Sequence, residues 1–146
     1  MESTNKKSKS LITFRLIVGL GIFHQIFCIL NVLAGSVVIE PLIARWLYQL
    51  SASAMHIFLI WKIVKLLRSA NLTNLKSLQT AIYLSIPIWI LCFFFIMKYV
   101  SGPAGGAAAA FLPVTCLFYM GIGAWIGSKK HVQDISAYEI WKSTQA

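Results

Sequence analysis

The sequence predicts an all-α integral membrane protein, a bundle of four transmembrane helices. Composition is the first reason: hydrophobic residues make up 58% and charged residues 12% of the 146 residues, where soluble domains have roughly a quarter charged residues. The mean hydropathy is +0.75. A single water-soluble domain of this length could not bury so many large apolar side chains, so the lipid bilayer has to be the solvent.

The regular spacing of the charged residues is the second reason. Long uncharged stretches are separated by short charged or turn-forming segments, and each stretch is close to the ~20 residues that a spanning helix needs. The residue before a proline disfavours helix and a proline can start one, so Pro41 marks the first connection. RSANLTNLK (68–76) and SGPAGG (101–106) mark the other two. The expected spans are 15–37, 42–64, 78–98 and 104–127.

The basic residues predict the orientation. With these four spans, all of the 13 Lys and Arg residues except Arg45 and Lys98 fall on one side of the membrane. Cytoplasmic loops carry the excess of Lys and Arg, so both termini are expected in the cytoplasm. The net charge is +9. The basic residues flank the spans and do not alternate with aromatic residues, so the expected partner is the lipid bilayer and not a nucleic acid.

Polar residues recur along one side of each of the first two spans. GIFHQIFC (21–28) places a histidine and a cysteine in a stripe that also includes Gly21 and Gly35. In an antiparallel hairpin that turns near residue 41, each polar residue of the first span lies at about the same depth in the membrane as a polar residue of the second span. We therefore expect the two helices to face each other and hide their polar groups from lipid. The candidate polar interior, which would line any substrate path, consists of His24, Cys28, Asn31, Gln49, Ser53 and His56.

Three kinds of chemistry are open to this interior. His24 and His56 lie at one depth, where two imidazoles can hold a b-type haem and form an electron-transfer or quinone-reactive anchor. His24 and Cys28 share a helix face and could bind a transition metal together with His56. The spans contain no Asp or Glu to orient such ligands, so we expect no metal site and favour hydrogen bonding between helices. A small oligomeric transporter is the third alternative.

No arrangement of nucleophile, base and orienting group is recognisable, so no catalytic residue is assigned and an enzyme is not expected. Small residues recur every fourth position at Gly102, Gly106 and Ala110, and again at Gly123 and Gly127. This spacing allows two helices to approach closely. In the tail, 129–146, the apolar residues recur every third position, which predicts a short amphipathic helix.

The fourth span ends in AWIGSKKHV (124–132). A tryptophan near the exit followed by Ser-Lys-Lys-His-Val resembles the ending of small four-span bacterial inner-membrane proteins without an assigned function. In those proteins a W-I-P-Y exit precedes Ser-Lys-Arg-Val, and Gly127 departs from their proline-aromatic pair. The resemblance implies a four-span fold in the bacterial inner membrane but no activity. The expected role is a non-enzymatic accessory or assembly component, which packs its helices with itself or with a larger membrane complex.

Overall fold

The structure is a computed structural model that describes the backbone of residues 2–36, 39, 42–99 and 103–145, and the side chains of 11–34, 36, 39, 42–94, 98 and 114–144. Its regular secondary structure in these ranges is entirely helical, so the predicted all-α class is confirmed. The five helices are α1 (Glu2–Gly35), α2 (Leu42–Arg68), α3 (Leu72–Tyr99), α4 (Pro103–Ile126) and α5 (Lys129–Gln145).

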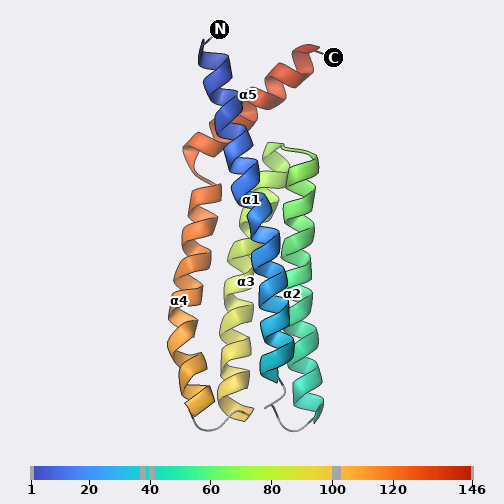
Figure 1. Ribbon diagram of the computed structural model, residues 1–146, viewed down its shortest axis with the longest axis vertical. Coiled ribbons are helices and arrows are strands. Elements are labelled where there is room, and N and C mark those ends of the chain that lie inside the picture. Colours follow the sequence, from blue (N-terminus) through green and yellow to red (C-terminus); the bar gives the residue numbers. More distant parts are fainter. Residues whose placement is uncertain (1, 37–38, 40–41, 100–102, 146) are drawn as a thin grey trace.

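The first four helices run side by side along the long axis of the molecule (Figure 1). Neighbours in sequence pack against each other: α1 on α2, α2 on α3, and α3 on α4. The helix α5 turns across one end and contacts α1 and α3. Both ends of the chain lie at this same end of the molecule (Figure 1).

Within the described residues, three segments are long and apolar enough to cross a membrane: Leu11–Ala34, Leu42–Arg68 and Leu72–Phe94. The helix α1 starts well before its expected span because the basic segment that precedes the span contains no Pro or Gly to interrupt a helix. The bounds of α4 agree with the fourth expected span, but its described side chains cover only the apolar part from Val114 to Ile126. Pro41 and Gly102 lie outside the described residues.

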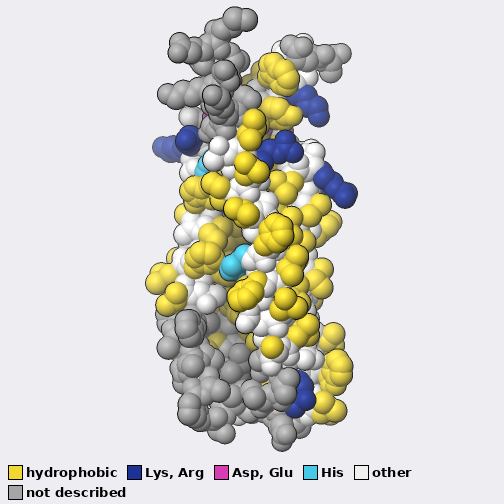
Figure 2. Space-filling model, in the orientation of Figure 1, with side chains coloured by type: hydrophobic (Ala, Val, Ile, Leu, Met, Phe, Trp, Pro, Cys, Tyr) yellow, Lys and Arg dark blue, Asp and Glu magenta, His cyan; other side chains and the backbone are white. Residues whose placement is uncertain are grey.

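The surface of the molecule carries many exposed hydrophobic side chains, as expected of a surface that faces lipid. In the view of Figure 2, hydrophobic side chains cover the middle of the molecule, and Lys and Arg side chains gather toward its ends. Large apolar residues such as Leu16, Phe23 and Leu91 are about two-thirds exposed. In water this surface would be unfavourable, whereas in a bilayer it faces hydrocarbon.

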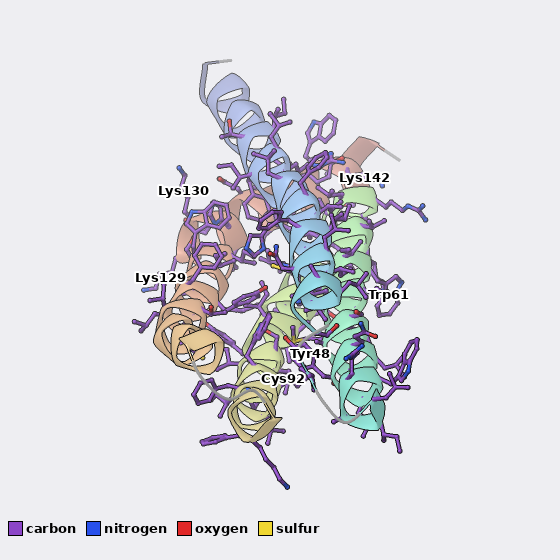
Figure 3. All side chains as sticks on the ribbon, turned by 60° about the horizontal axis from the view of Figure 1, so that its bottom comes forward. Tyr48, Trp61, Cys92, Lys129, Lys130 and Lys142 are labelled. Carbon is purple, nitrogen blue, oxygen red and sulfur yellow. The ribbon has the colours of Figure 1, made fainter. Side chains whose placement is uncertain are left out.

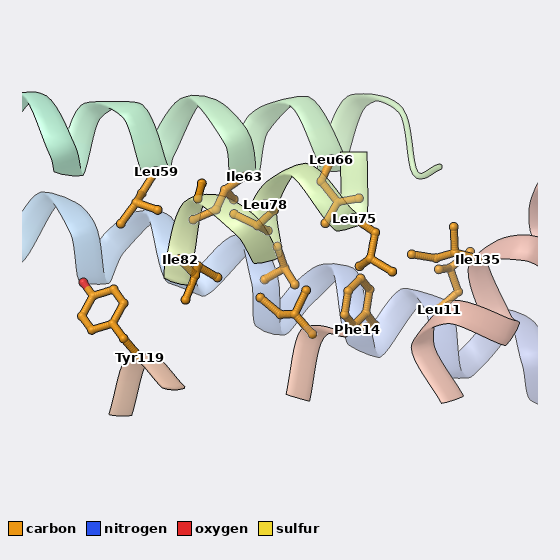
Figure 4. Close-up of a cluster of buried hydrophobic side chains, with 13 residues drawn as sticks. Leu11, Phe14, Leu59, Ile63, Leu66, Leu75, Leu78, Ile82, Tyr119 and Ile135 are labelled. Carbon is orange, nitrogen blue, oxygen red and sulfur yellow. The ribbon is translucent and has the colours of Figure 1, made fainter. Parts of the chain in front are cut away.

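A hydrophobic core near the end with the termini draws on all five helices (Figure 4). Leu11 of α1, Leu66 of α2, Leu75 of α3 and Ile135 of α5 are each less than a tenth exposed. Tyr119 brings α4 into the same cluster. This core fixes the positions of the helices around the polar residues described below.

A second, smaller cluster lies toward the other end of α2 and α3. Tyr48 of α2 and Cys92 of α3 belong to it, and Figure 3 shows them close together between the two helices. Trp61 in the same figure points away from the helices and is about half exposed. The two clusters together hold α2 against α3 over most of their length.

Gly123 of α4 and Gly127, which directly follows this helix, let the chain approach α3. A Cβ atom at Gly123 would lie 2.7 Å from Cε1 of Tyr83, and one at Gly127 would overlap the side-chain amide of Gln79. That amide donates a hydrogen bond to the carbonyl oxygen of Gly123 over 3.1 Å. The spacing of Gly123 and Gly127 therefore serves packing within the molecule. The side chains at 106 and 110 lie outside the described part of the chain.

The connection between α2 and α3 is held by hydrogen bonds. Asn71 caps α3, since its Oδ1 accepts from the backbone N–H of Asn74 over 2.7 Å. The Nδ2 of Asn74 donates to the carbonyl of Ser69, also over 2.7 Å. Arg15 of α1 reaches the end of α2, where its Nη2 donates to the carbonyl of Leu67 over 2.5 Å.

A buried histidine forms the corner between α4 and α5. The ring of His131 packs against Phe14, with centroids 4.4 Å apart, and against Trp125 at 4.6 Å. Its Nδ1 lies 2.8 Å from the carbonyl oxygen of Trp125 and 2.9 Å from Oγ of Ser128. The Trp…Ser-Lys-Lys-His sequence thus turns the chain and docks α5 on α1.

Candidate functional site

The side-chain amide of Gln25 on α1 joins three helices. Its Oε1 accepts a hydrogen bond from Nδ1 of His56 on α2 over 2.7 Å. Its Nε2 donates to Oη of Tyr119 on α4 over 3.2 Å, and lies 3.2 Å from Nδ1 of His24. Gln25 is buried, so an amide that hydrocarbon would penalise is satisfied inside the protein.

Trp89 of α3 completes this group. Its ring packs edge-on against His56, with centroids 5.2 Å apart, and lies 6.3 Å from the ring of Tyr119. We refer to Gln25, His24, His56, Trp89 and Tyr119 as the Gln25 cluster. Each of the helices α1 to α4 contributes at least one member, so the cluster exists only when all four are assembled.

Some hydrogen-bonding capacity in this region is unused. Among the described side chains, Nε2 of His56, Nε1 of Trp89 and Oγ of Ser53 are buried without a hydrogen-bond partner. His56 donates through Nδ1, so the neutral ring presents an acceptor at Nε2. Unsatisfied buried polar atoms are costly and uncommon in folded proteins.

The polar stripe of α1 does not coincide with the helix face that packs on α2. The buried residues Val18, Gln25 and Val32 recur every seven positions and define that face. His24 is exposed beside it, and its ring lies 5.5 Å from that of Phe118 on α4. One residue along a helix turns the side chain by about 100°, which is why Gln25 and not His24 points at His56.

The other predicted residues of α1 lie on the same outward side as His24. Cys28 is half-buried, with its Sγ 3.8 Å from Nδ1 of His24. Asn31 is exposed, and its Nδ2 donates to the carbonyl of Phe27 in its own helix over 2.8 Å. We call His24, Cys28 and Asn31 the α1 polar stripe.

The polar residues of α2 have different partners. Gln49 donates through Nε2 to Oγ of Ser36, at the end of α1, over 2.6 Å. Ser53 is largely covered and points its unpaired Oγ into the interior. The predicted residues are therefore divided between the Gln25 cluster, the Gln49–Ser36 contact and the α1 polar stripe, and Ser53 belongs to none of these groups.

The arrangement around Gln25 also affects whether His24 and His56 can bind a haem or a metal ion. Both His24 and His56 direct Nδ1 at the amide of Gln25, so this amide occupies the space between the two imidazoles. A haem held between them would have to displace it. The described residues contain no group of three or more His, Cys, Asp or Glu side chains that could hold a metal ion.

A groove runs between α1 and α4, with α2 and α3 as its floor. Its volume is about 680 Å³, and almost all the side chains that line it are apolar. The polar groups that line it come from His24, Gln25 and Tyr119, toward one end of the groove. Gly121 borders the groove on α4, and a Cβ atom there would meet nothing within 4 Å. The groove therefore offers apolar space with one polar position.

Sequence reasoning left the residue at the centre of the site out of the predicted polar interior. Gln25 lies in the quoted GIFHQIFC stretch, but the three- and four-residue spacing selected its neighbour His24. The seven-residue spacing of Leu11, Val18, Gln25 and Val32 was the available signal. Trp89 and Tyr119 carry no such signal because their partners are distant in sequence.

These observations define an all-helical protein with three helices fit to span a membrane and a polar cluster among its helices. Comparison with family models, with curated proteins and with solved structures gave no match.

Proposed function

We propose that this protein is a non-enzymatic accessory component of the bacterial inner membrane that acts by assembling with a second copy of itself through α1. In this proposal α1 to α4 form a four-helix bundle with both termini in the cytoplasm. The α1 polar stripe supports the assembly, because it lies outside the core formed by the other helices.

Asn31 gives the main support for assembly with a second copy. Its side chain is exposed within the apolar segment Leu11–Ala34, and one N–H bonds within α1. The second N–H and Oδ1 have bonding capacity left, and unsatisfied amide groups in lipid are costly. A primary amide is both donor and acceptor, so two copies with the same orientation can bond reciprocally across a two-fold axis. A second copy therefore satisfies the stripe without any other component.

The distribution of charge supports the orientation. Arg68 and Lys142 border the same pocket at the end of the molecule that holds both termini, and Lys129 and Lys130 begin α5 at that end. Arg45 lies near the start of α2, at the opposite end. A basic end of this kind faces the cytoplasm under the positive-inside rule.

Native cysteine chemistry tests the assembly, since Cys28 lies in the stripe one turn from Asn31. In a Cys116→Ser background, oxidation in membranes is expected to yield a disulfide-linked dimer through Cys28. Asn31→Leu should lower the dimer yield at low expression by about tenfold, since a polar contact between membrane helices contributes ~1–2 kcal/mol. Gel mobility and intact mass measure the product.

Ser51→Leu is the matched control. Ser51 is an exposed polar residue of α2 whose Oγ donates to the carbonyl of Leu47 in its own helix over 2.8 Å. It should leave dimer formation unchanged. Equal dimer yields with and without the Asn31 amide, or a cross-linked product of another mass, would contradict assembly with a second copy.

The groove between α1 and α4 favours a second candidate function, the binding of a quinone or a similar lipid with a carbonyl head. The neutral His24 ring accepts from Gln25 at Nδ1 and so carries its proton on Nε2. His24 lines the groove, so in this proposal its N–H donates to the carbonyl of the head. The apolar walls suit an isoprenoid chain.

Gly121→Phe tests this candidate because Gly121 lines the groove and a Cβ atom there would meet nothing within 4 Å. The quinone that stays with the purified protein, measured by mass spectrometry, is expected to fall about tenfold when the apolar space is filled. Met120→Phe adds the same ring at an exposed position outside the groove and should retain the quinone. Equal quinone content in both variants would rule the groove out as the binding site.

A further inference from the structure

A polar pocket of about 390 Å³ lies where α1, the α2–α3 connection and α5 meet. Arg15 of α1, Arg68 of α2 and Lys142 of α5 surround it, together with Asn71 and Tyr138. These residues are distant in sequence, and the docking of α5 brings them together. The pocket is separate from the Gln25 cluster and from the groove.

The pocket has an excess of positive charge. Three of its side chains are cationic and Glu139 is the one acidic residue among those that line it. Arg15 is held in place by its hydrogen bond to Leu67, while Arg68 and Lys142 form no ion pair with Glu139. The capped N-terminus of α3 begins beside the pocket, after Asn71, and its backbone dipole adds partial positive charge.

The pocket lies at the level of lipid headgroups. Trp61, two turns before Arg68 on α2, is exposed, and the Nζ atoms of Lys62 and Lys65 lie 4.6 and 5.7 Å from its ring. Tryptophan next to lysine on a lipid-facing helix is typical of the membrane–water interface. Trp141, next to Lys142, is also exposed. A ligand of the pocket can therefore extend an apolar part into the bilayer.

We propose that this pocket binds the phosphate group of an anionic phospholipid. Arg68 and Lys142 supply charge-assisted hydrogen bonds to the phosphate oxygens, and Arg15 holds a third positive charge beside them. Arginine suits this role because its planar group can donate two parallel hydrogen bonds to one phosphate. The site is independent of the proposed self-assembly, because the α1 polar stripe lies on the membrane-embedded part of the molecule.

Native mass spectrometry of the full chain in detergent tests the proposal with phosphatidylglycerol as the probe. The double variant Arg68→Gln/Lys142→Gln is expected to bind this lipid about tenfold more weakly, because two charge-assisted contacts are lost. Lys129→Gln/Lys130→Gln removes the same charge from the side next to α4 (Figure 3) and should bind normally. Arg68→Lys, which keeps the charge but loses the two parallel hydrogen bonds, should bind more tightly than Arg68→Gln and more weakly than the unchanged protein.

Each other result overturns the proposal. Equal losses in the two double variants would show non-specific attraction between a basic protein and an anionic lipid. No loss in either would show that the pocket does not take the lipid. Displacement of phosphatidylglycerol by millimolar inorganic phosphate would show a site for free phosphate. Unchanged helix content by circular dichroism in all variants confirms that the comparison concerns folded protein.

Discussion

Ile135→Ala is expected to release α5 from the end of the molecule and to destabilise its docking by about 2–4 kcal/mol. The Ile135 side chain is fully buried in the core that includes Leu11 and Phe14 of α1 (Figure 4). In the proposed topology this part of the core lies outside the hydrocarbon, so water is the alternative surroundings and the hydrophobic effect acts fully. Amide hydrogen exchange in 129–145 should become about a hundredfold faster.

Ile140→Ala is the matched control because it makes the same change in the same helix. Ile140 is 65% exposed, so its truncation should leave hydrogen exchange of α5 unchanged. If the two variants exchange alike, the packing of α5 on α1 and α3 does not hold the helix in place. The released helix would also separate Lys142 from Arg68, so Ile135→Ala should weaken the binding of phosphatidylglycerol.

Gln25→Leu is expected to have the second largest effect, a loss of about 2 kcal/mol in the stability of the helix assembly. The substitution has a similar volume but leaves Nδ1 of His56 and Oη of Tyr119 without the amide that pairs with them. The midpoint of thermal unfolding in detergent should fall by about 4–8 °C for a chain of this length. Gln133→Leu, the same change at an exposed position of α5, should have almost no effect.

A double-mutant cycle separates the hydrogen bond from the shape of the residue. His56→Phe removes the donor and keeps a ring beside Trp89, so Gln25→Leu should cost about 1 kcal/mol less in that background. Strictly additive losses would show that the contact between Gln25 and His56 does not contribute to stability.

The sequence predicted the helical class and the approximate bounds of the long helices because both depend on local composition. In a bilayer, a long run of apolar residues between charges is stable as a helix, because a helix satisfies the backbone hydrogen bonds within the segment. It predicted the small-residue spacing at Gly123 and Gly127, which the structure shows in contact with α3. It also placed polar groups in the first two helices, but it selected His24 where Gln25 makes the contact with His56.

The angular position of a residue explains that difference. Spacings of three and four residues fit several overlapping faces of one helix, and only packing against neighbours decides which face is buried. Tyr119 and Trp89 join the cluster through contacts between distant helices, and no pattern along the chain indicates them. The same holds for the basic pocket, since Arg15, Arg68 and Lys142 meet only after α5 docks.

By itself, the sequence determined that this chain is helical, that it is fit for a bilayer and that polar residues lie within its apolar segments. Those properties follow from the free energy of transferring side chains and backbone from water to lipid. Each segment has its own transfer free energy, which does not depend on the other segments. Only the tertiary structure decided that Gln25 joins α1, α2 and α4, and that Asn31 faces outward. Hydrogen bonds and packing between helices depend on their relative rotation, which a single segment does not specify.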